Sequence, residues 1–374
     1  MTRGALVLFL VSVIFGFTAA YAGHGSYSLT PQKLADGVYV FWGRQEPPTL
    51  ENGGNIVNTG FIVGTNSVLV VDTGPTQRYA KEMIAAIRNI SELPIRIAVV
   101  THHHPDHSFG IQHFKKNNAA IYMHRNLKTL LAKEGPILLE LLENLSGKTW
   151  VSGTKIGEPN HLIETEQTID IGGRIVKILP LVNGHTPGDL LVYDQKTQIL
   201  FAGDLVFHER AASVPHANIS VWLNHLDTIR DLGWRKLVPG HGPIVTDQTP
   251  IEELKAYLNF LEQTATESIQ RGDTLAEVLQ STIPAPFDKL ATIQSEFQRS
   301  MTSLFRKLES EAFGLLISAL GLGALLGSLT IAALGPKRRG GLLIAGGLVS
   351  ALGLTLIALV PQYYPSVVFM LLLG

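Results

Sequence analysis

The chain has 374 residues, of which 45% are hydrophobic and 16% are charged, and it contains no cysteine. Its formal net charge of −1 at pH 7 argues against a nucleic-acid-binding protein, because phosphate contacts need clustered Lys and Arg. The lack of cysteine excludes a disulfide framework, a thiolate metal ligand and a cysteine nucleophile. Any metal must therefore be held by His, Asp and Glu.

Much of the apolar excess behind the mean hydropathy of +0.20 lies at the two ends of the chain. At the N-terminus, Arg3 precedes the apolar run Ala5–Phe17, and Ala20-Tyr21-Ala22 fits a small-x-small cleavage site. This pattern is typical of a secretory signal peptide over residues 1–22, with an uncleaved membrane anchor as the alternative. Either interpretation sends the residues that follow across a membrane.

Residues 23–309 alternate between β-rich runs, helical patterns and turn residues. The β-rich runs are predicted at Val38–Trp42, Ile56–Val63, Val68–Val71, Ile95–Val100, Ala120–Met123, Arg174–Leu179, Leu190–Tyr193 and Ile199–Ala202. Helices are predicted after Pro75 and over Ser108–Lys116, Arg125–Asn144, Ser220–Leu232, Ile251–Arg271 and Phe287–Leu308. Two β-rich halves, each followed by helices, predict an α/β fold with a two-sheet sandwich and helical outer layers.

A histidine-rich run follows the predicted strand Ile95–Val100: Thr101-His102-His103-His104-Pro105-Asp106-His107. A loop at the end of a strand displays ligands from a rigid scaffold, and neutral imidazoles with carboxylates suit zinc. Because side chains alternate along extended backbone, we expect His102 and His104 to face one way and His103 the other. Asp106 and His107 follow the proline and could serve a second metal.

Three further segments place a histidine or an aspartate after a predicted strand. His185 lies in a Gly/Pro-rich turn, Asp204 follows the apolar run that ends at Ala202, and His241 lies between two glycines. Each segment alone is a weak signal, because a single His or Asp in such a turn is usually a turn residue. Together with the histidine run, and in this order, they predict one metal centre.

The combined pattern is His-x-His-x-Asp-His, then His, Asp and His, and it is met by His102, His104, Asp106, His107, His185, Asp204 and His241. Over about residues 33–309 the sequence therefore resembles a metallo-β-lactamase-fold hydrolase, which implies an αββα sandwich. Val71-Asp72-Thr73-Gly74 matches the early acidic turn of that family, whose Asp supports the metal loop.

The resemblance also implies the roles of the matched residues. His102, His104 and His185 hold one zinc; Asp106, His107 and His241 hold the other; Asp204 bridges the two. The two zinc ions would present a bridging hydroxide to a small-molecule ester, thioester or amide, with β-lactams as a minority alternative. Asp106 is the expected catalytic residue, because it could orient the hydroxide or accept its proton.

The finer assignment also comes from the resemblance. The motif order and the exported context are most similar to the zinc metallohydrolases of quinoprotein-relay and sulfur-oxidation gene clusters. A redox or sulfur-metabolism accessory protein that binds substrate or iron with the same fold is the alternative. A membrane transporter with a periplasmic sensor domain is a third hypothesis.

Most of the other histidines are expected to be packing or surface residues: His103, His113, His124, His161 and His225. His208 and His216 differ, because the segment after Asp204 could form a loop that lines the substrate cleft. We therefore regard these two as candidates for contact with substrate.

Residues 310–374 carry two apolar runs, Phe313–Leu334 and Gly341–Val360, each long enough to cross a hydrocarbon core of ~30 Å. The turn between them carries three positive charges, which places it in the cytoplasm and residues 23–309 on the periplasmic or extracellular side. The segment resembles about two and a half helices of a major facilitator transporter, with Ser366–Gly374 as the incomplete one. We expect membrane attachment, and no transport by this chain alone.

Overall fold

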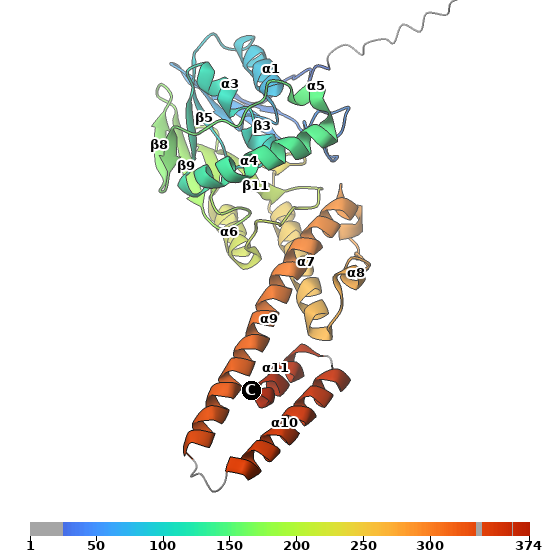
Figure 1. Cartoon of the computed structure of the whole chain (residues 1–374). Coiled ribbons are helices and arrows are strands. Elements are labelled where there is room, and N and C mark those ends of the chain that lie inside the picture. The colour runs from blue at the N-terminus through green and yellow to red at the C-terminus, as the bar shows by residue number, and fades with distance from the viewer. Residues whose placement is uncertain (1–24, 334–338, 361) are drawn as a thin grey trace, which may run out of the picture.

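The computed structural model describes residues 25–333, 339–360 and 362–374. The predicted signal peptide, residues 1–22, and most of the predicted cytoplasmic turn lie outside these ranges and stay predictions. The described chain forms an α/β unit, and a long helix extends from it towards two further helices (Figure 1).

The first sheet of the α/β unit has seven strands, which lie side by side in chain order. They are β1 (Gln32–Ala35), β2 (Val38–Phe41), β3 (Thr59–Val63), β4 (Val68–Val71), β5 (Ile95–Val99), β6 (Ala120–His124) and β7 (His161–Ile163). Strands β1 to β4 pair antiparallel, whereas β4 to β7 pair parallel. Since parallel strands end at the same edge, the segments after β4 and β5 lie side by side.

The second sheet has five strands in the order β12-β11-β10-β9-β8. They are β8 (Gln167–Asp170), β9 (Ile175–Leu181), β10 (Asp189–Asp194), β11 (Ile199–Phe207) and β12 (Lys236–His241). Strands β8 to β11 pair antiparallel, and β12 pairs parallel with β11. The ends of β11 and β12 therefore lie at one edge of this sheet.

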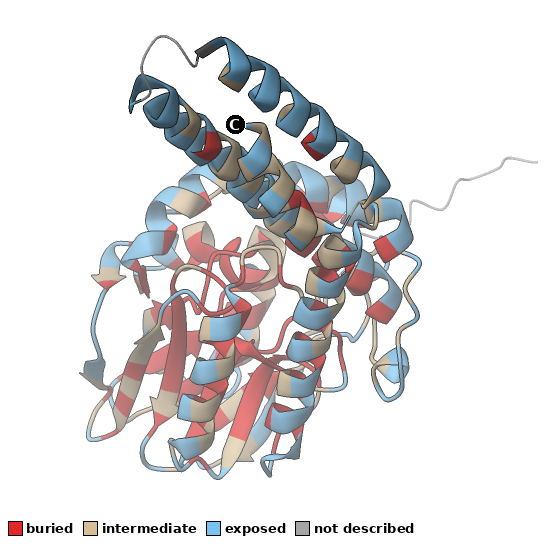
Figure 2. Ribbon diagram, turned by 90° about the horizontal axis from the view of Figure 1, so that it is seen from below, coloured by how far each residue is buried: buried red, intermediate tan, exposed pale blue. Residues whose placement is uncertain are grey.

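The two sheets pack face to face, because strands alternate their side chains between two buried surfaces. In β4, Leu69 and Val71 join a buried cluster with Phe201 of the second sheet, whereas Val68 and Val70 pack towards the helices. Figure 2 shows the buried strands behind helices that are exposed on their outer sides. This four-layer αββα arrangement confirms the predicted fold class.

Helices cover both outer faces of the sandwich. On the first sheet these are α1 (Gln77–Arg88), α2 (Pro105–Ser108), α3 (Ile111–Lys116), α4 (Arg125–Ser146) and α5 (Lys148–Val151). On the second sheet, α6 (Ile219–Asp231) and α7 (Thr249–Arg271) contact β11. The elements α8 (Leu275–Val278), η1 (Phe287–Lys289) and α9 (Ile293–Ala333) pack outside them, with α9 and α8 against α7 and η1 against α9. Apolar side chains of α6, α7 and α9 form one buried cluster with β11.

Some element boundaries differ from the sequence predictions for local reasons. The predicted helix Ser108–Lys116 is replaced by α2 and α3, and Gly110 caps the start of α3. Strand β11 continues to Phe207 instead of ending at Ala202, because it pairs with β12 as far as Phe207 and His241. The short strands β1 and β7 carry too few apolar residues to stand out in the sequence.

Helix α9 runs without a break across residues 309 and 310, where the sequence places the boundary of the hydrolase domain. Its C-terminal part and α10 (Arg339–Leu359) are long and apolar enough to cross a membrane, and only 6% of each apolar window is buried. Helix α11 (Tyr363–Leu373) packs against α9 at Gly323, where an added Cβ would lie 2.1 Å from the carbonyl oxygen of Leu371. Because residue 323 is glycine, α9 and α11 can pack closely here.

Candidate metal centre

The loop after β5 is fixed by the aspartate that follows β4. Asp72 accepts hydrogen bonds from the backbone N–H of Thr101 at 2.7 Å and from its hydroxyl at 3.0 Å. The same carboxylate accepts a hydrogen bond from Nδ1 of His107 at 2.8 Å. Asp72 adopts a left-handed backbone conformation, with φ of 60°, which turns its side chain towards the loop. Asp72 therefore supports the histidine-rich loop, as the family pattern implies.

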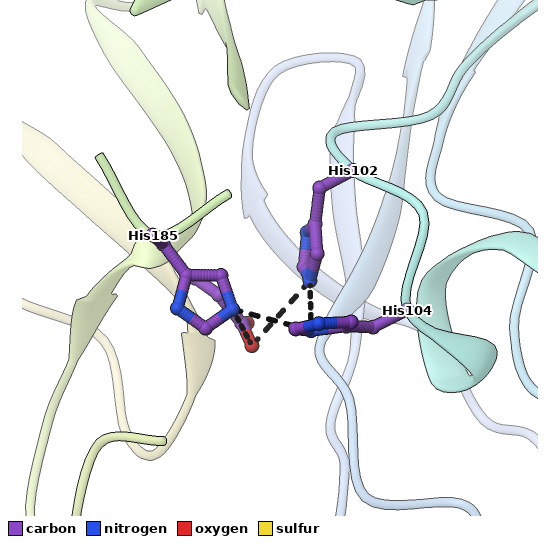
Figure 3. A group of neighbouring side chains, drawn as sticks. His102, His104 and His185 are labelled. Carbon is purple, nitrogen blue, oxygen red and sulfur yellow. Dashed lines mark hydrogen bonds and ion pairs between the residues drawn. The ribbon is translucent and has the colours of Figure 1, made fainter. Parts of the chain in front are cut away.

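Three histidines converge on one side of the centre (Figure 3). Nδ1 of His104 lies 3.0 Å from Nε2 of His102 and 3.2 Å from Nε2 of His185. Oδ2 of Asp204 lies 3.6 Å from Nε2 of His102 and 3.5 Å from Nε2 of His185. Four buried side chains thus present one ligand atom each to a common point.

A second group lies on the other side of Asp204. Its Oδ1 is 3.1 Å from Nε2 of His107 and 3.3 Å from Nε2 of His241. Oδ2 of Asp106 lies 3.6 Å from Nε2 of His107 and 3.3 Å from Nε2 of His241. The two carboxylate oxygens of Asp204 therefore face different groups of ligand atoms.

Asp204 lies inside β11, and not at the end of a strand as the sequence suggests. Two glycines make room for it. Gly203 has φ of 51° and lies against Thr101, while a Cβ on Gly240 would lie 1.9 Å from Oδ1 of Asp204. The neighbouring strand can approach this carboxylate closely only because residue 240 is glycine.

The turns that carry His185 and His241 are held by hydrogen bonds from other elements. Asp189 accepts a hydrogen bond from the hydroxyl of Thr186 at 2.7 Å, which closes the turn around His185. Asn58 donates to the carbonyl oxygens on both sides of His241, at 2.9 Å and 2.8 Å. The sequence analysis missed Asn58, whose only signal is a polar residue within an apolar run.

The imidazoles of the first group are neutral at ordinary pH. Burial, aided by the neighbouring imidazoles, holds the pKa values of His102 and His104 well below the ordinary value. Burial also lowers the pKa of His185 to about 3. Since a metal binds the neutral imidazole, these three side chains are already in the binding form.

The second group is electrostatically different. Burial alone would lower the pKa of His107, but Asp204, Asp72 and Asp106 raise it well above its ordinary value. Burial would raise the pKa of Asp204, but His241 and His107 hold it well below its usual range. The carboxylates therefore favour a positive charge at this position, which a proton or a metal cation can supply.

Two buried atoms indicate that the residues fit a metal. Nε2 of His107 and Oδ1 of Asp204 make no hydrogen bond within the described chain, although they lie 3.1 Å apart. The other nitrogen of His107 faces Asp72, and Nδ1 of His241 donates to the carbonyl oxygen of Ile56 at 2.8 Å. Both Nε2 atoms thus face the centre, which is the arrangement of metal-binding histidines.

A chain of polar side chains continues outwards from His104. Its Nε2 lies 3.0 Å from Nδ1 of His216, and Nε2 of His216 lies 3.2 Å from Oε2 of Glu134 on α4. His103 is fully buried, faces away from the first group, and places its Nε2 3.3 Å from the same Glu134 oxygen. His208, in contrast, packs its Nδ1 against the carbonyl oxygen of Pro243. Sequence analysis gave no sign of Glu134.

The centre opens into a cleft. Its floor includes His104, Asp106, Asp204 and His241. Leucines of α4 line the cleft, and so do Arg210 and, from α9, Glu296 and Arg299. The His and Asp cluster is therefore accessible to a small molecule through this cleft, which residues of α4 and α9 line.

The chain was compared with known families and proteins. The model of the metallo-beta-lactamase superfamily matches residues 52–241, which include all seven clustered His and Asp residues. The acyl-coenzyme A thioesterase MBLAC2 of Gallus gallus is 25% identical over 230 residues, covering 54% of this chain and 77% of that protein. The metallo-beta-lactamase type 2 of Bacteroides fragilis is 21% identical over 268 residues, covering 69% and 98%.

Solved structures show the same fold. A metallo-beta-lactamase from Pontibacter korlensis matches with a TM-score of 0.51 at 20% identity, covering 62% of this chain and 99% of that chain. The αββα sandwich, the His and Asp cluster at one edge of it, and the match of the family model agree. The chain belongs to the metallo-beta-lactamase superfamily of metal-dependent hydrolases.

Proposed function

We propose that the chain is an exported, zinc-dependent hydrolase that cleaves an ester, thioester or amide bond. The observation that carries this proposal is the position of Asp204, whose two carboxylate oxygens face two separate groups of ligand atoms. A bridging carboxylate between two histidine groups is suited to a pair of metal ions.

The proposed ligands follow the two groups. One ion is assigned to His102, His104 and His185, the other to Asp106, His107 and His241, and Asp204 contributes to both. When bound, two zinc ions would polarise the scissile carbonyl and lower the pKa of a water molecule towards neutrality. Imidazole and carboxylate donors suit zinc, whereas iron held by the same donors would support a redox or sulfur-metabolism role.

Asp106 is the proposed catalytic residue. Its carboxylate borders the cleft, and 14% of its side chain is exposed, so water can reach it. It lies 3.3 Å from Nε2 of His241, which fixes its position relative to the centre. Asp106 is therefore placed to orient the attacking water, accept its proton and return the proton to the leaving group.

The relatives support acyl transfer to water. One is named an acyl-coenzyme A thioesterase and another a metallo-beta-lactamase, and both names describe hydrolysis at an acyl carbon. We favour an ester or thioester over a β-lactam, because the cleft has a wall of leucines beside the centre. The likeness to quinoprotein-relay and sulfur-oxidation metallohydrolases remains part of this proposal.

We also propose a membrane-attached location. Residues 1–22 would direct export, residues 23–309 would form the hydrolase domain, and residues 310–374 would attach it to the membrane with the domain on the periplasmic or extracellular side. Two apolar helices of sufficient length support the attachment. The likeness of residues 310–374 to part of a major facilitator transporter stays a proposal, and we expect no transport by this chain.

The test is metal analysis and a hydrolysis panel on the full chain in lipid nanodiscs. We expect about two zinc ions per chain and turnover within a panel of β-lactams, thioesters, lactones and phosphodiesters. His104→Ala is expected to lose one ion and to lower kcat/KM by about a thousandfold, because it removes a ligand. His161→Ala is the matched control, because His161 is exposed.

Two outcomes would contradict the proposal. The first is less than one zinc per chain together with hydrolysis that His104→Ala leaves unchanged. The second is a visible absorption spectrum from bound iron with no hydrolysis of the panel, which would favour the redox or sulfur-metabolism role.

A further inference from the structure

The wall of the cleft on α4 is apolar and regularly spaced. It consists of Leu138, Leu141, Leu142 and Leu145, at positions i, i+3, i+4 and i+7 of the helix. This spacing places all four side chains along one face. From Leu138 to Leu145 the helix rises about 10 Å, the length of an extended chain of about eight carbon atoms.

Exposed apolar side chains are concentrated at this wall. Among the described residues up to 309, six large apolar side chains are exposed: Leu50, Ile90, Ile137, Leu141, Leu145 and Val182. Three of them, Ile137, Leu141 and Leu145, follow one another at intervals of four along α4. Leu50 lies against the end of the same helix, next to Gly147. Such a cluster marks a binding surface rather than scattered surface residues.

Two arginines also line the cleft. Arg210 is only 5% exposed, and its Nη1 donates to the backbone carbonyl oxygens of Arg44 and Glu46. Glu296 also lines the cleft, and its negative charge favours the charged form of Arg210. Arg299 is exposed and lines the same cleft, and the charges of Arg210, Arg299 and Glu296 sum to +1.

The geometry points to an amphiphilic acyl thioester or ester as the substrate. Its aliphatic chain lies along the leucines of α4, its scissile carbonyl lies at the His and Asp cluster, and an anionic leaving group lies beside Arg210 and Arg299. This inference rests on the proposed hydrolase function and adds the substrate class. Burial of methylene groups against the leucines and the attraction of the arginines would select such a molecule from short or neutral acyl compounds.

The reaction that this substrate undergoes is simple hydrolysis. The oxygen of water bonds to the acyl carbon, and the bond from that carbon to sulfur or oxygen breaks. The leaving group takes one proton of the water as a thiol or alcohol, and the other proton is released as the acid ionises. The products are a fatty carboxylate and an anionic thiol or alcohol.

The experiment measures chain-length preference with the full chain in nanodiscs, because detergent tails would compete for the groove. Thioesters of 3-mercaptopropionate with acyl chains of two to ten carbons are compared with thioesters of N-acetylcysteamine, whose leaving group is neutral. We expect kcat/KM to rise about twofold per added methylene up to about eight carbons. At equal chain length, we expect the anionic series to be about fivefold better.

Matched variants assign these preferences to the leucines and to Arg299. Leu141→Gln with Leu145→Gln is expected to lower the ratio of ten-carbon to two-carbon kcat/KM at least fivefold, while Ile90→Gln leaves it unchanged, because Ile90 lies away from the cleft. Arg299→Gln is expected to abolish the preference for the anionic series. Arg306→Gln, an exposed arginine on the same helix outside the cleft lining, is the control.

Some results of these experiments would refute the acyl groove without refuting the proposed hydrolase function. If thioesters are hydrolysed with a flat chain-length series, or if the leucine variant keeps the wild-type ratio, the acyl groove is wrong and the hydrolase proposal stands. If the leucine variant instead alters only binding to phospholipid vesicles, the leucines contact the membrane and the inference is overturned.

If no thioester, ester or amide is turned over, the proposed function fails. The groove is then tested by calorimetric titration of the zinc-treated chain with decanoate and acetate. Decanoate is expected to bind at least tenfold more tightly in the wild type, and equal affinities would overturn the inference.

Discussion

The α/β unit and the C-terminal helices use the same apolar residue types in opposite ways. In the α/β unit, valine and leucine of the strands are buried between layers, and the buried charged side chains are paired, clustered or hydrogen-bonded. In α9 and α10 the leucines point outwards, and only 6% of their apolar windows is buried. The α/β unit therefore completes its own core, whereas the C-terminal helices need an apolar environment around them.

The largest effect is expected for a change at Asp204, which should abolish hydrolysis without affecting attachment to the membrane. Asp204→Asn removes the charge of the residue that faces both groups of ligand atoms, so we expect the metal content to fall and kcat/KM to fall at least a thousandfold. The fraction of the chain that sediments with membranes should stay unchanged. Asp231→Asn, at an exposed position on α6, is the control. A variant that retains both metals and full activity would show that Asp204 is not a bridging ligand.

A second change, in the apolar part of α9, should impair membrane insertion. Leu325 is 55% exposed, and a lysine at this position would cost ~3 kcal/mol in a bilayer, or about a hundredfold in the ratio of inserted to translocated helices. Glycosylation sites engineered on either side of the helix report this ratio. Gln298→Lys, on the same helix within the α/β unit, should leave it unchanged. Equal insertion of Leu325→Lys and wild type would mean that this segment does not cross a membrane.

A third prediction concerns a buried ion pair that lies far from the metal centre. Arg174 donates to Asp194 at 2.9 Å and 2.7 Å, and both side chains are buried. Burial alone would raise the pKa of Asp194, but Arg174 and Thr197 hold it below the ordinary value. Asp194→Asn leaves a buried arginine without its partner, and we expect a loss of ~3 kcal/mol in the free energy of unfolding at pH 7.

The pH dependence of that loss follows from the lowered pKa. The ionised carboxylate stabilises the fold above about pH 4, where the unfolded chain is also ionised, and this contribution disappears as pH falls through the lower folded pKa. Thermal unfolding of wild type and Asp194→Asn should therefore differ most near neutral pH and converge in acid. A difference that is constant from pH 7 down to pH 3 would argue against an ionised pair.

The smallest effect is expected at Glu134. Its carboxylate contacts His216, which in turn contacts His104, so Glu134 orients a proposed ligand through one intermediate. Glu134→Gln keeps the shape and removes the charge, and we expect kcat to fall about fivefold with little change in KM. Glu140→Gln, exposed on the same helix, is the control. A change in KM alone would place Glu134 in substrate binding instead.

Several proposed ligands can be predicted from the local sequence, because His102, His185 and His241 lie in turns that contain glycine or proline. It does not place Asp204 inside β11, since Gly203-Asp204 within an apolar run is typical of a turn. That aspartate is tolerated in a buried strand because histidines from three other segments surround it. These contacts join segments that are distant in the sequence, so the position of Asp204 within a strand could not be predicted from the local sequence.

The role of Glu134 could not be predicted from the sequence either. Nothing in the spacing of α4 distinguishes Glu134 from Glu140, and only the packing of the helix over the histidine loop brings one of them to His216. The continuity of α9 was not predicted, although residues 309–312 contain neither glycine nor proline. The change from charged to apolar composition there marks a change of surroundings and not the end of a helix.

The unbroken course of α9 makes the helix a rigid spacer. Arg299 borders the cleft, and Phe313 begins the apolar part, 14 residues further along the same helix, or about 21 Å. With the apolar part in a bilayer, the opening of the cleft would stand at a fixed height above the lipid headgroups. The length of one helix would then decide how far an amphiphile must rise from the membrane to be cleaved.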